Sequence, residues 1–246
     1  MNKFNNREIY DKNWKNWVEM KIYGPASRWL RTLIGDLLRK IDATRIKTVL
    51  DVGSGEGTTT AYLAEKLPDA KVLGIDFSES GIQSSRAAYP LKNISFKHDV
   101  NSSELNNYYD LVTSFEVLEH VPEWKELLGR MAKSSRRYLL LSFPTGRMRQ
   151  FEKNVGHLRN FKKGEVEKYL ENVGYKPLSI FYAGFPFYSP LYRDFCNLTN
   201  AGNNEFTKGE YGFIQKLASS AIYALFYFFS TKKKYGDQFL GLFERK

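Results

Sequence analysis

Cysteine is nearly absent, because Cys196 is the only one among 246 residues. A single cysteine excludes an intrachain disulfide and a thiolate metal cluster, and it fits a reducing compartment. The first residues, MNKFNNREIYDKNWKNW, lack the apolar segment of a secretory signal. We therefore expect a cytoplasmic protein in which Cys196 packs as a small apolar residue.

The chain also lacks the excess of charge that would predict disorder. Hydrophobic residues make up 42% and charged residues 26%, a balance that supports a sizeable core. The length suits one α/β domain with room for an insertion. The formal net charge of +10 favours anionic partners. The basic residues are spread along the chain without a recognisable RNA-binding module, so nucleic acid is not the expected partner.

The main pattern in the sequence is an alternation of predicted strands and helices. Apolar residues at three- and four-residue spacing predict a first helix over Ile22–Ile41. Strands are then predicted at Thr48–Val52, Lys71–Phe77, Ile94–Val100, Tyr109–Phe115, Tyr138–Phe143, Pro177–Tyr182 and Phe239–Phe243. Helices are predicted between them at Thr58–Lys66, Glu79–Ala88, Trp124–Lys133 and Lys163–Asn172. This order predicts an α/β fold with a doubly wound, mostly parallel sheet covered by helices on both faces.

Two segments stand outside this alternation. We assign residues 1–44 to an N-terminal helical extension and residues 45–246 to the main domain, with an insertion at residues 184–236 before the last strand. Within the insertion, Phe213–Ser230 is apolar on nearly every helical face but slightly short for a membrane crossing. Three lysines follow, at 232–234, so residues 213–234 could contact the inner membrane surface as a peripheral helix. A buried helix, a lid or a dimer contact remain alternatives.

A glycine-rich loop gives the sharpest functional signal. VLDVGSGEG, residues 49–57, runs from a predicted strand through three glycines into a helix, and Asp76 ends the next strand, where it could bind the hydroxyls of a ribose. NAD-binding folds share this arrangement, but their pyrophosphate tolerates no nearby negative charge. Asp51 and Glu56 would repel a pyrophosphate and would suit a ligand that carries an ammonium and a sulfonium. The loop therefore favours S-adenosylmethionine (SAM) over NAD.

Four motifs, VLDVGSGEG, VLGIDFSES, FKHDV and SFEVLEHVPE, resemble in order and spacing those of class I SAM-dependent methyltransferases. They are most similar to the branch that includes ubiquinone-biosynthesis O-methyltransferases and many small-molecule and glycan methyltransferases. The resemblance covers about residues 45–182 and implies a Rossmann-like fold with a seven-stranded sheet. It implies SAM as cofactor, S-adenosylhomocysteine (SAH) as product, and a cofactor site formed by Asp51, Gly53, Ser54, Gly55, Asp76, Phe77, Asp99, Val100, Phe115 and Glu116.

Within that resemblance each residue has an expected role. Asp51, Gly53 and Gly55 would line the methionine moiety, and Asp76 would bind the ribose. Phe77 would flank the adenine, while Asp99 and Val100 would meet its amino group and ring edge. Phe115 and Glu116 would close the pocket beneath the reacting sulfur.

The segment EVLEH and a second histidine supply the candidate catalytic residues His120, His157 and Glu119. Glu116, Glu119 and His120 follow at i, i+3 and i+4, so on a helical turn they would share one face. One hypothesis makes His120 or His157 a general base for an acceptor hydroxyl. Another makes the two carboxylates and two imidazoles ligands of a divalent cation, as in some relatives that carry this segment. A third gives them only a structural role in the turn, and we assign no metal.

Aromatic residues gather after the predicted sixth strand, a position that often borders the acceptor pocket in this fold. The cluster comprises Phe181, Tyr182, Phe185, Phe187, Tyr188, Tyr192 and Phe195. It favours an apolar or sugar-bearing acceptor. The expected reaction is methyl transfer from SAM to a hydroxyl of a small, amphipathic, glycan-linked or lipid-linked acceptor. An RNA-modifying methyltransferase and a catalytically silent SAM-binding partner protein are the alternatives.

Overall fold

The computed structural model describes residues 17–199 and 209–246. Seven strands form one sheet in the order β3-β2-β1-β4-β5-β7-β6. The pairs among β1 to β5 are parallel, whereas β7 runs antiparallel to both β5 and β6. The strands are β1 Thr48–Val52, β2 Lys71–Asp76, β3 Ile94–His98, β4 Tyr109–Phe115, β5 Ser135–Pro144, β6 Tyr175–Ala183 and β7 Gln238–Arg245. This confirms the predicted fold class.

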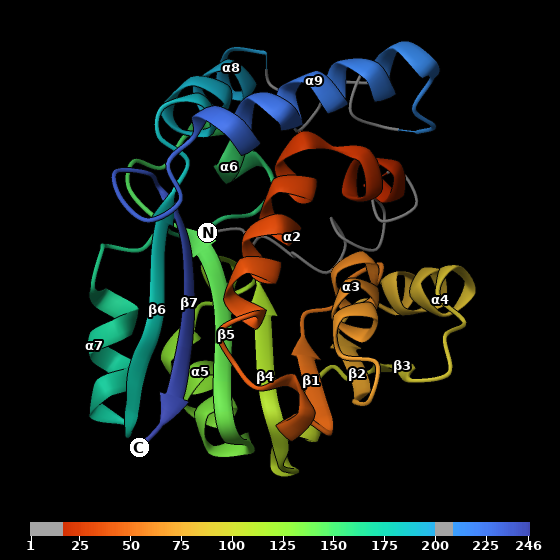
Figure 1. Cartoon of the computed structure of the whole chain (residues 1–246), viewed down its shortest axis with the longest axis vertical. Coiled ribbons are helices and arrows are strands. Elements are labelled where there is room, and N and C mark those ends of the chain that lie inside the picture. Colours follow the sequence, from red (N-terminus) through yellow and green to blue (C-terminus); the bar gives the residue numbers. More distant parts are fainter. Residues whose placement is uncertain (1–16, 200–208) are drawn as a thin grey trace, which may run out of the picture.

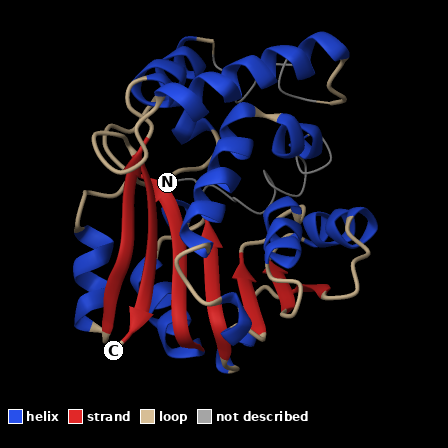
Figure 2. Cartoon of the chain, in the orientation of Figure 1, coloured by secondary structure: helices blue, strands red, loops and turns tan. Residues whose placement is uncertain are grey.

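Helices lie on both faces of the sheet and above its upper edge (Figures 1 and 2). They are α2 Pro25–Leu38, α3 Thr58–Lys66, α4 Glu79–Ala88, α5 Trp124–Ser134, α6 Gln150–Asn154, α7 Glu165–Asn172, α8 Arg193–Leu198 and α9 Phe213–Phe229. Short turns are η1 Ala43–Arg45, η2 Ser103–Asn106, η3 Leu118–His120 and η4 Phe187–Tyr192. Residues 17–23 are also helical. The sequence pattern predicted the seven strands and six of these eight helices to within three residues, and it missed α6, α8 and the short turns.

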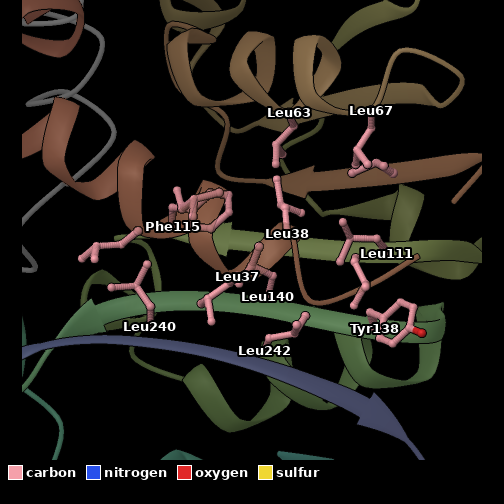
Figure 3. Close-up of a cluster of buried hydrophobic side chains, with 14 of the residues drawn as sticks. Leu37, Leu38, Leu63, Leu67, Leu111, Phe115, Tyr138, Leu140, Leu240 and Leu242 are labelled. Atoms are coloured by element: carbon pink, nitrogen blue, oxygen red, sulfur yellow. The ribbon is translucent and has the colours of Figure 1, made fainter. Parts of the chain in front are cut away.

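Each face of the sheet carries its own apolar core, because successive strand side chains point to opposite faces. On one face, Leu111, Leu140 and Leu242 from the strands meet Leu37 of α2 and Leu63 of α3 (Figure 3). On the other face, side chains of α5 and α7 pack against the alternate strand residues. Such interdigitated burial supplies most of the stabilisation of a sheet of this kind.

Helix α2 belongs to the first of these cores. Pro25 occupies its first turn, where a missing N–H is tolerated, and Trp29, Leu33 and Leu37 are buried along one stripe. The segment assigned from the sequence to an N-terminal extension thus packs on the sheet, although its residues 1–16 lie outside the described part of the chain.

Helices α8 and α9 lie above the upper edge of the sheet, and α9 runs above α2 (Figure 1). Phe226 of α9 is buried and contacts the rings of Trp29, Tyr188 and Tyr192. The predicted apolar helix of the insertion is therefore present, and its inner side packs on the domain. In residues 17–199 and 209–246, no helix combines the length and apolar character needed to cross a bilayer.

Candidate functional site

A cavity of about 770 Å³ opens at the carboxyl ends of β1, β2 and β4. Open α/β sheets bind ligands at this edge, and the volume lies within the range of small-molecule sites. All the predicted cofactor residues except Gly55 line it, namely Asp51, Gly53, Ser54, Asp76, Phe77, Asp99, Val100, Phe115 and Glu116. Residues at or just after the ends of four strands, β1, β2, β3 and β4, thus surround one space.

The glycine loop turns tightly at the end of β1. Gly53 has φ +82°, and a Cβ there would lie 2.3 Å from Cγ2 of Val117. A side chain at this position would therefore meet both backbone strain and a steric clash. Gly55 does not line the cavity, but its N–H donates to Oδ2 of Asp76 over 2.9 Å. The loop thereby fixes the orientation of the ribose-binding candidate.

Two buried carboxyl groups, Asp51 and Asp76, stand on the cavity wall. Asp51 accepts hydrogen bonds from the hydroxyls of Thr60 (2.6 Å) and Thr113 (2.7 Å). Asp76 also accepts from the N–H of Ser78 over 2.7 Å. Burial raises the pKa of each carboxyl to about 6, and the hydrogen bonds oppose that shift. Both groups are held in place and ionise near neutral pH.

The far end of the cavity carries the residues predicted for the adenine. The Asp99 carboxyl accepts from the N–H of Glu104 (2.9 Å) and the hydroxyl of Ser103 (3.1 Å), which anchors it to η2. Burial acts to raise the pKa of Asp99, but these hydrogen bonds outweigh burial and lower it overall. Nearer the loop, the buried hydroxyl of Ser54 has no hydrogen-bond partner among the described residues. A buried hydroxyl without a partner is an unmet polar contact that a ligand could satisfy.

The helical segment before α2 forms a wall that the sequence did not predict. Trp17, Met20 and Lys21 line the cavity, and Arg31 of α2 donates to the carbonyl oxygens of Lys21 and Ile22 over 2.7 and 2.8 Å. Burial raises the pKa of Glu56 in the glycine loop, and the charge of Lys21 opposes this. This segment carries no motif, so only the packing of α2 brings it to the site.

The EVLEH segment adopts a different geometry from the predicted one. Only Leu118–His120 forms a helical turn, and Glu116 precedes it with a left-handed backbone at φ +57°. Glu116 accepts hydrogen bonds from Ser142 (2.7 Å) and Gln238 (2.8 Å) instead of joining the turn. Left-handed non-glycine residues often occur at functional sites, where the surroundings hold the strained backbone.

Glu119 lies behind the cavity wall rather than on it. It is fully buried, and neither carboxyl oxygen has a hydrogen-bond partner among the described residues. Burial raises its pKa well above the ordinary value, and the nearby charge of Glu116 adds to the effect. Any influence that Glu119 has on the reaction passes through its neighbour His120, whose Nε2 lies 4.0 Å from Oε1 of Glu119.

His120 and His157 do come together and both line the cavity. Their rings meet edge to face with centroids 4.6 Å apart, and the backbone bond from Leu158 N–H to Glu119 O ties the two loops together. Nδ1 of His120 lies 3.0 Å from the carbonyl oxygen of Gly156; since a carbonyl only accepts, Nδ1 donates and the lone pair lies on Nε2. Burial lowers the pKa of His120 to about 3 and of His157 to about 4. Both rings are thus neutral at pH 7.

Three of the four metal ligands considered from the sequence lie close together in the structure. Glu119, His120 and His157 can offer ligand atoms within 4.8 Å of one another. Glu116, the fourth residue of the predicted set, is bonded to Ser142 and Gln238 instead.

The end of the cavity formed by η4 and α8 is partly aromatic. Tyr188 and Tyr192 line it, next to Arg193 and the buried Cys196. Of the predicted aromatic cluster only these two reach the cavity, since Phe181 lies in the core and Phe185 and Phe195 are exposed.

The buried Arg193 binds Glu152 of α6 through its Nε (2.9 Å) and a second nitrogen. This pair fastens α8 to α6. The pairing joins residues far apart in sequence, and no local pattern predicted it.

Comparison with known proteins adds family relationships. A family model described as a methyltransferase domain matches residues 26–180. The malonyl-[acyl-carrier protein] O-methyltransferase of Acetivibrio thermocellus is 27% identical over 137 residues, 55% of this chain and 47% of that protein. The trans-aconitate 2-methyltransferase of Deinococcus radiodurans is 34% identical over 96 residues, 39% of this chain and 36% of that protein. The matched region thus spans less than half of the length of these curated relatives.

Solved structures extend the likeness to the whole chain. Magnesium protoporphyrin IX methyltransferase from Synechocystis with bound SAM has a TM-score of 0.59 at 16% identity, and the match covers 100% of both chains. Its SAH-bound form has a TM-score of 0.60 and covers 98% of this chain and 100% of that one. At this identity the likeness shows a shared fold.

Proposed function

The chain belongs to the methyltransferase-domain family of class I SAM-dependent enzymes, and from that premise we propose that it transfers a methyl group from SAM to a hydroxyl of a small amphipathic, glycan-linked or lipid-linked acceptor. The observation that carries the proposal is the cavity at the carboxyl edge of the sheet. Buried carboxyls and neutral histidines line one continuous space there.

The residues of the cavity fit SAM. Asp76 would bind the ribose hydroxyls, while Asp51 and Glu56 would favour the cationic methionine end over a pyrophosphate. The unsatisfied hydroxyl of Ser54 offers a further contact. When bound, SAM supplies a methyl group on an electrophilic sulfonium, so the task left to the chain is to hold the acceptor in line with it. Such positioning contributes up to about 7–11 kcal/mol to lowering a barrier.

His120 is our candidate general base. A hydroxyl needs to lose a proton as its oxygen attacks the methyl group, and Nε2 of the neutral His120 can take that proton. His157 packs against the ring and helps to fix its orientation. Glu119 acts as a positioning residue beneath His120. The resemblance of the motifs to ubiquinone-biosynthesis O-methyltransferases also supports a hydroxyl as acceptor.

We propose an amphipathic acceptor because aromatic side chains and an exposed apolar helix lie at the end of the cavity where it would bind. Tyr188 and Tyr192 form an aromatic wall, and both rings contact Phe226 of α9. The outer side of α9 is apolar and exposed, with Ile214 at 78%, Leu217 at 61% and Phe228 at 72%. Two exposed lysines, Lys233 and Lys234, follow the helix. We infer that this face contacts an anionic membrane surface and receives a lipid-linked acceptor there.

The test is transfer of tritiated methyl from SAM into lipid, glycan and RNA fractions of a cell extract. We expect label in the lipid or glycan fraction, in a form that resists mild alkali, because methyl ethers resist alkali and methyl esters do not. Label released by alkali would place the methyl on a carboxyl, contradicting the hydroxyl assignment. Label only in RNA would favour the RNA-modifying alternative, and SAM binding without any transfer would favour a silent partner protein.

A further inference from the structure

A second cavity, of about 540 Å³, lies between α2, α9 and the helical segment 17–23. Its described lining residues are all different from those of the cofactor cavity. Three of them are cationic, namely Arg28, Arg31 and Lys216, and among the described residues no carboxylate lines the space. The charged side chains that line this cavity are therefore all cationic.

Arg31 is the deepest of the three cations. Its hydrogen bonds to described residues go to the carbonyl oxygens of Lys21 and Ile22, which carry no net charge. Burial is the main cause that lowers the pKa of its guanidinium, and Glu56 opposes this only through its charge. A half-buried cation without a neutralising partner is costly. Because guanidinium has five N–H donors, Arg31 retains donors for a further ligand.

Arg28 and Lys216 face the cavity with partly satisfied charges. Arg28 donates to the hydroxyl of Ser220 over 3.0 Å and stacks over the ring of Tyr223 at 4.2 Å. Lys216 lies 3.6 Å from a carboxylate oxygen of Glu19, outside normal hydrogen-bond distance. The hydroxyl of Thr32 donates to the carbonyl oxygen of Arg28 over 3.1 Å and accepts from that of Tyr223 over 2.9 Å, so both protons are already used. Two guanidiniums and an ammonium form a donor set suited to a tetrahedral oxyanion.

The cavity also borders the exposed apolar side of α9. Lys216, Ser220 and Tyr223 recur at four- and three-residue spacing, so they share one helix face. Ile214, Leu217 and Phe228 lie on the neighbouring face that points away from the domain. If the apolar face of α9 entered a membrane, the cations beside it would lie at the level of the lipid phosphates.

We propose that this cavity binds the phosphate group of an anionic ligand, with Arg28, Arg31 and Lys216 as its ligating residues. The phosphate could belong to a phospholipid headgroup or to a soluble phosphoester. The site is independent of the cofactor cavity, so it can exist whether or not the proposed methyl transfer is correct.

The experiment compares two sources of phosphate on the full chain. Inorganic phosphate and glycerol 3-phosphate are titrated by calorimetry at constant ionic strength. In parallel, flotation is measured with phosphatidylcholine vesicles that contain or lack phosphatidylglycerol. We expect saturable binding in at least one arm, and the arm that responds identifies the source. Arg28→Gln and Lys216→Gln should each weaken that binding roughly ten-fold, the loss of one charge-assisted hydrogen bond.

Lys133→Gln, an exposed lysine on α5 across the sheet, is the matched control because it removes the same charge elsewhere. SAH affinity and melting temperature show that each variant is folded with an intact cofactor cavity. The proposal is overturned if neither phosphate nor phosphatidylglycerol vesicles bind, or if both cavity variants bind like Lys133→Gln.

Discussion

At the residue scale, Asp76 both accepts two backbone hydrogen bonds and faces the cofactor cavity. Asp76→Asn keeps the size of the side chain but removes its charge and one acceptor. We predict roughly 10- to 100-fold weaker SAH binding, since a hydrogen bond to a charged group contributes about 1.5–3 kcal/mol. Calorimetry measures this change, with the exposed Asp69→Asn as control. Equal affinity of Asp76→Asn and wild type would remove Asp76 from the site.

The raised pKa values of Asp51 and Asp76 predict a pH dependence. Burial moves both from 3.8 to about 6, so the unliganded folded state binds protons more readily than the unfolded state. These groups therefore reduce stability as pH rises from about 4 to 6. A bound sulfonium reverses this by favouring the charged carboxylates. The rise in melting temperature caused by SAM should be larger at pH 7.5 than at pH 5, and an equal rise at both would contradict this.

The proposed role of His120 as general base leads to a prediction about the rate of methyl transfer. His120→Gln removes the proposed base, and we expect methyl transfer to slow by about 10²–10⁴-fold. The affinity for SAH should change less than two- or three-fold, because the variant keeps a polar side chain of similar length. Since both imidazoles are neutral, transfer with saturating SAM should also show no acid limb from histidine between pH 5 and 8. A variant that keeps full activity would refute the role, and loss of wild-type activity in EDTA would favour a metal instead.

The sequence predicted these residues unevenly. The glycine loop and Asp76 could be predicted because their spacing reflects one local strand–turn–helix unit. Glu116 lines the cavity as predicted, but it lies outside the expected helical turn, because its left-handed backbone leaves no periodic signal in the sequence. The pairing of His120 with His157 depends on a loop contact between distant segments, so the sequence named both histidines and placed them together only within the metal hypothesis.

At the element scale, long periodic segments were predictable and short ones were not. Helices α3 and α4 match their predicted bounds, because their apolar spacing and flanking glycine or serine are local. The predictions omitted α6 and α8, which have five and six residues. Tertiary contacts such as the Arg193–Glu152 pair hold these short helices, and such contacts leave no local pattern.

The exposed outer face of helix α9 leads to a prediction about membrane contact. Leu217→Ser and Phe228→Ser together replace two exposed apolar side chains on its outer face. We expect the affinity for anionic vesicles, measured by flotation, to fall about 100-fold or more, since burying each side chain contributes about 1.5–3 kcal/mol. Leu91→Ser removes an exposed leucine far from α9 and should leave flotation unchanged. If the double variant floats like the wild type, the outer face of α9 does not contact lipid.

At the scale of the whole molecule, the strand order explains why scattered residues form one site. The parallel strands β1, β2, β3 and β4 end at the same edge, so the motifs that follow them converge. Helix α2 then brings residues 17–23 over that edge. Residues of η4 and α8 form another wall of the cavity, and α9 packs behind the rings of Tyr188 and Tyr192. The sequence predicted the convergence through the fold, whereas the wall from residues 17–23 became visible only in the packed structure.

The central claim is that a cavity lined by Asp51, Glu56 and Asp76 holds a cationic nucleoside. Titration calorimetry of the folded chain with SAM, SAH and NAD tests it most directly. The account predicts saturable one-site heats for SAM and SAH and none for NAD. Heat from NAD alone, or no heat from SAM and SAH, would contradict it.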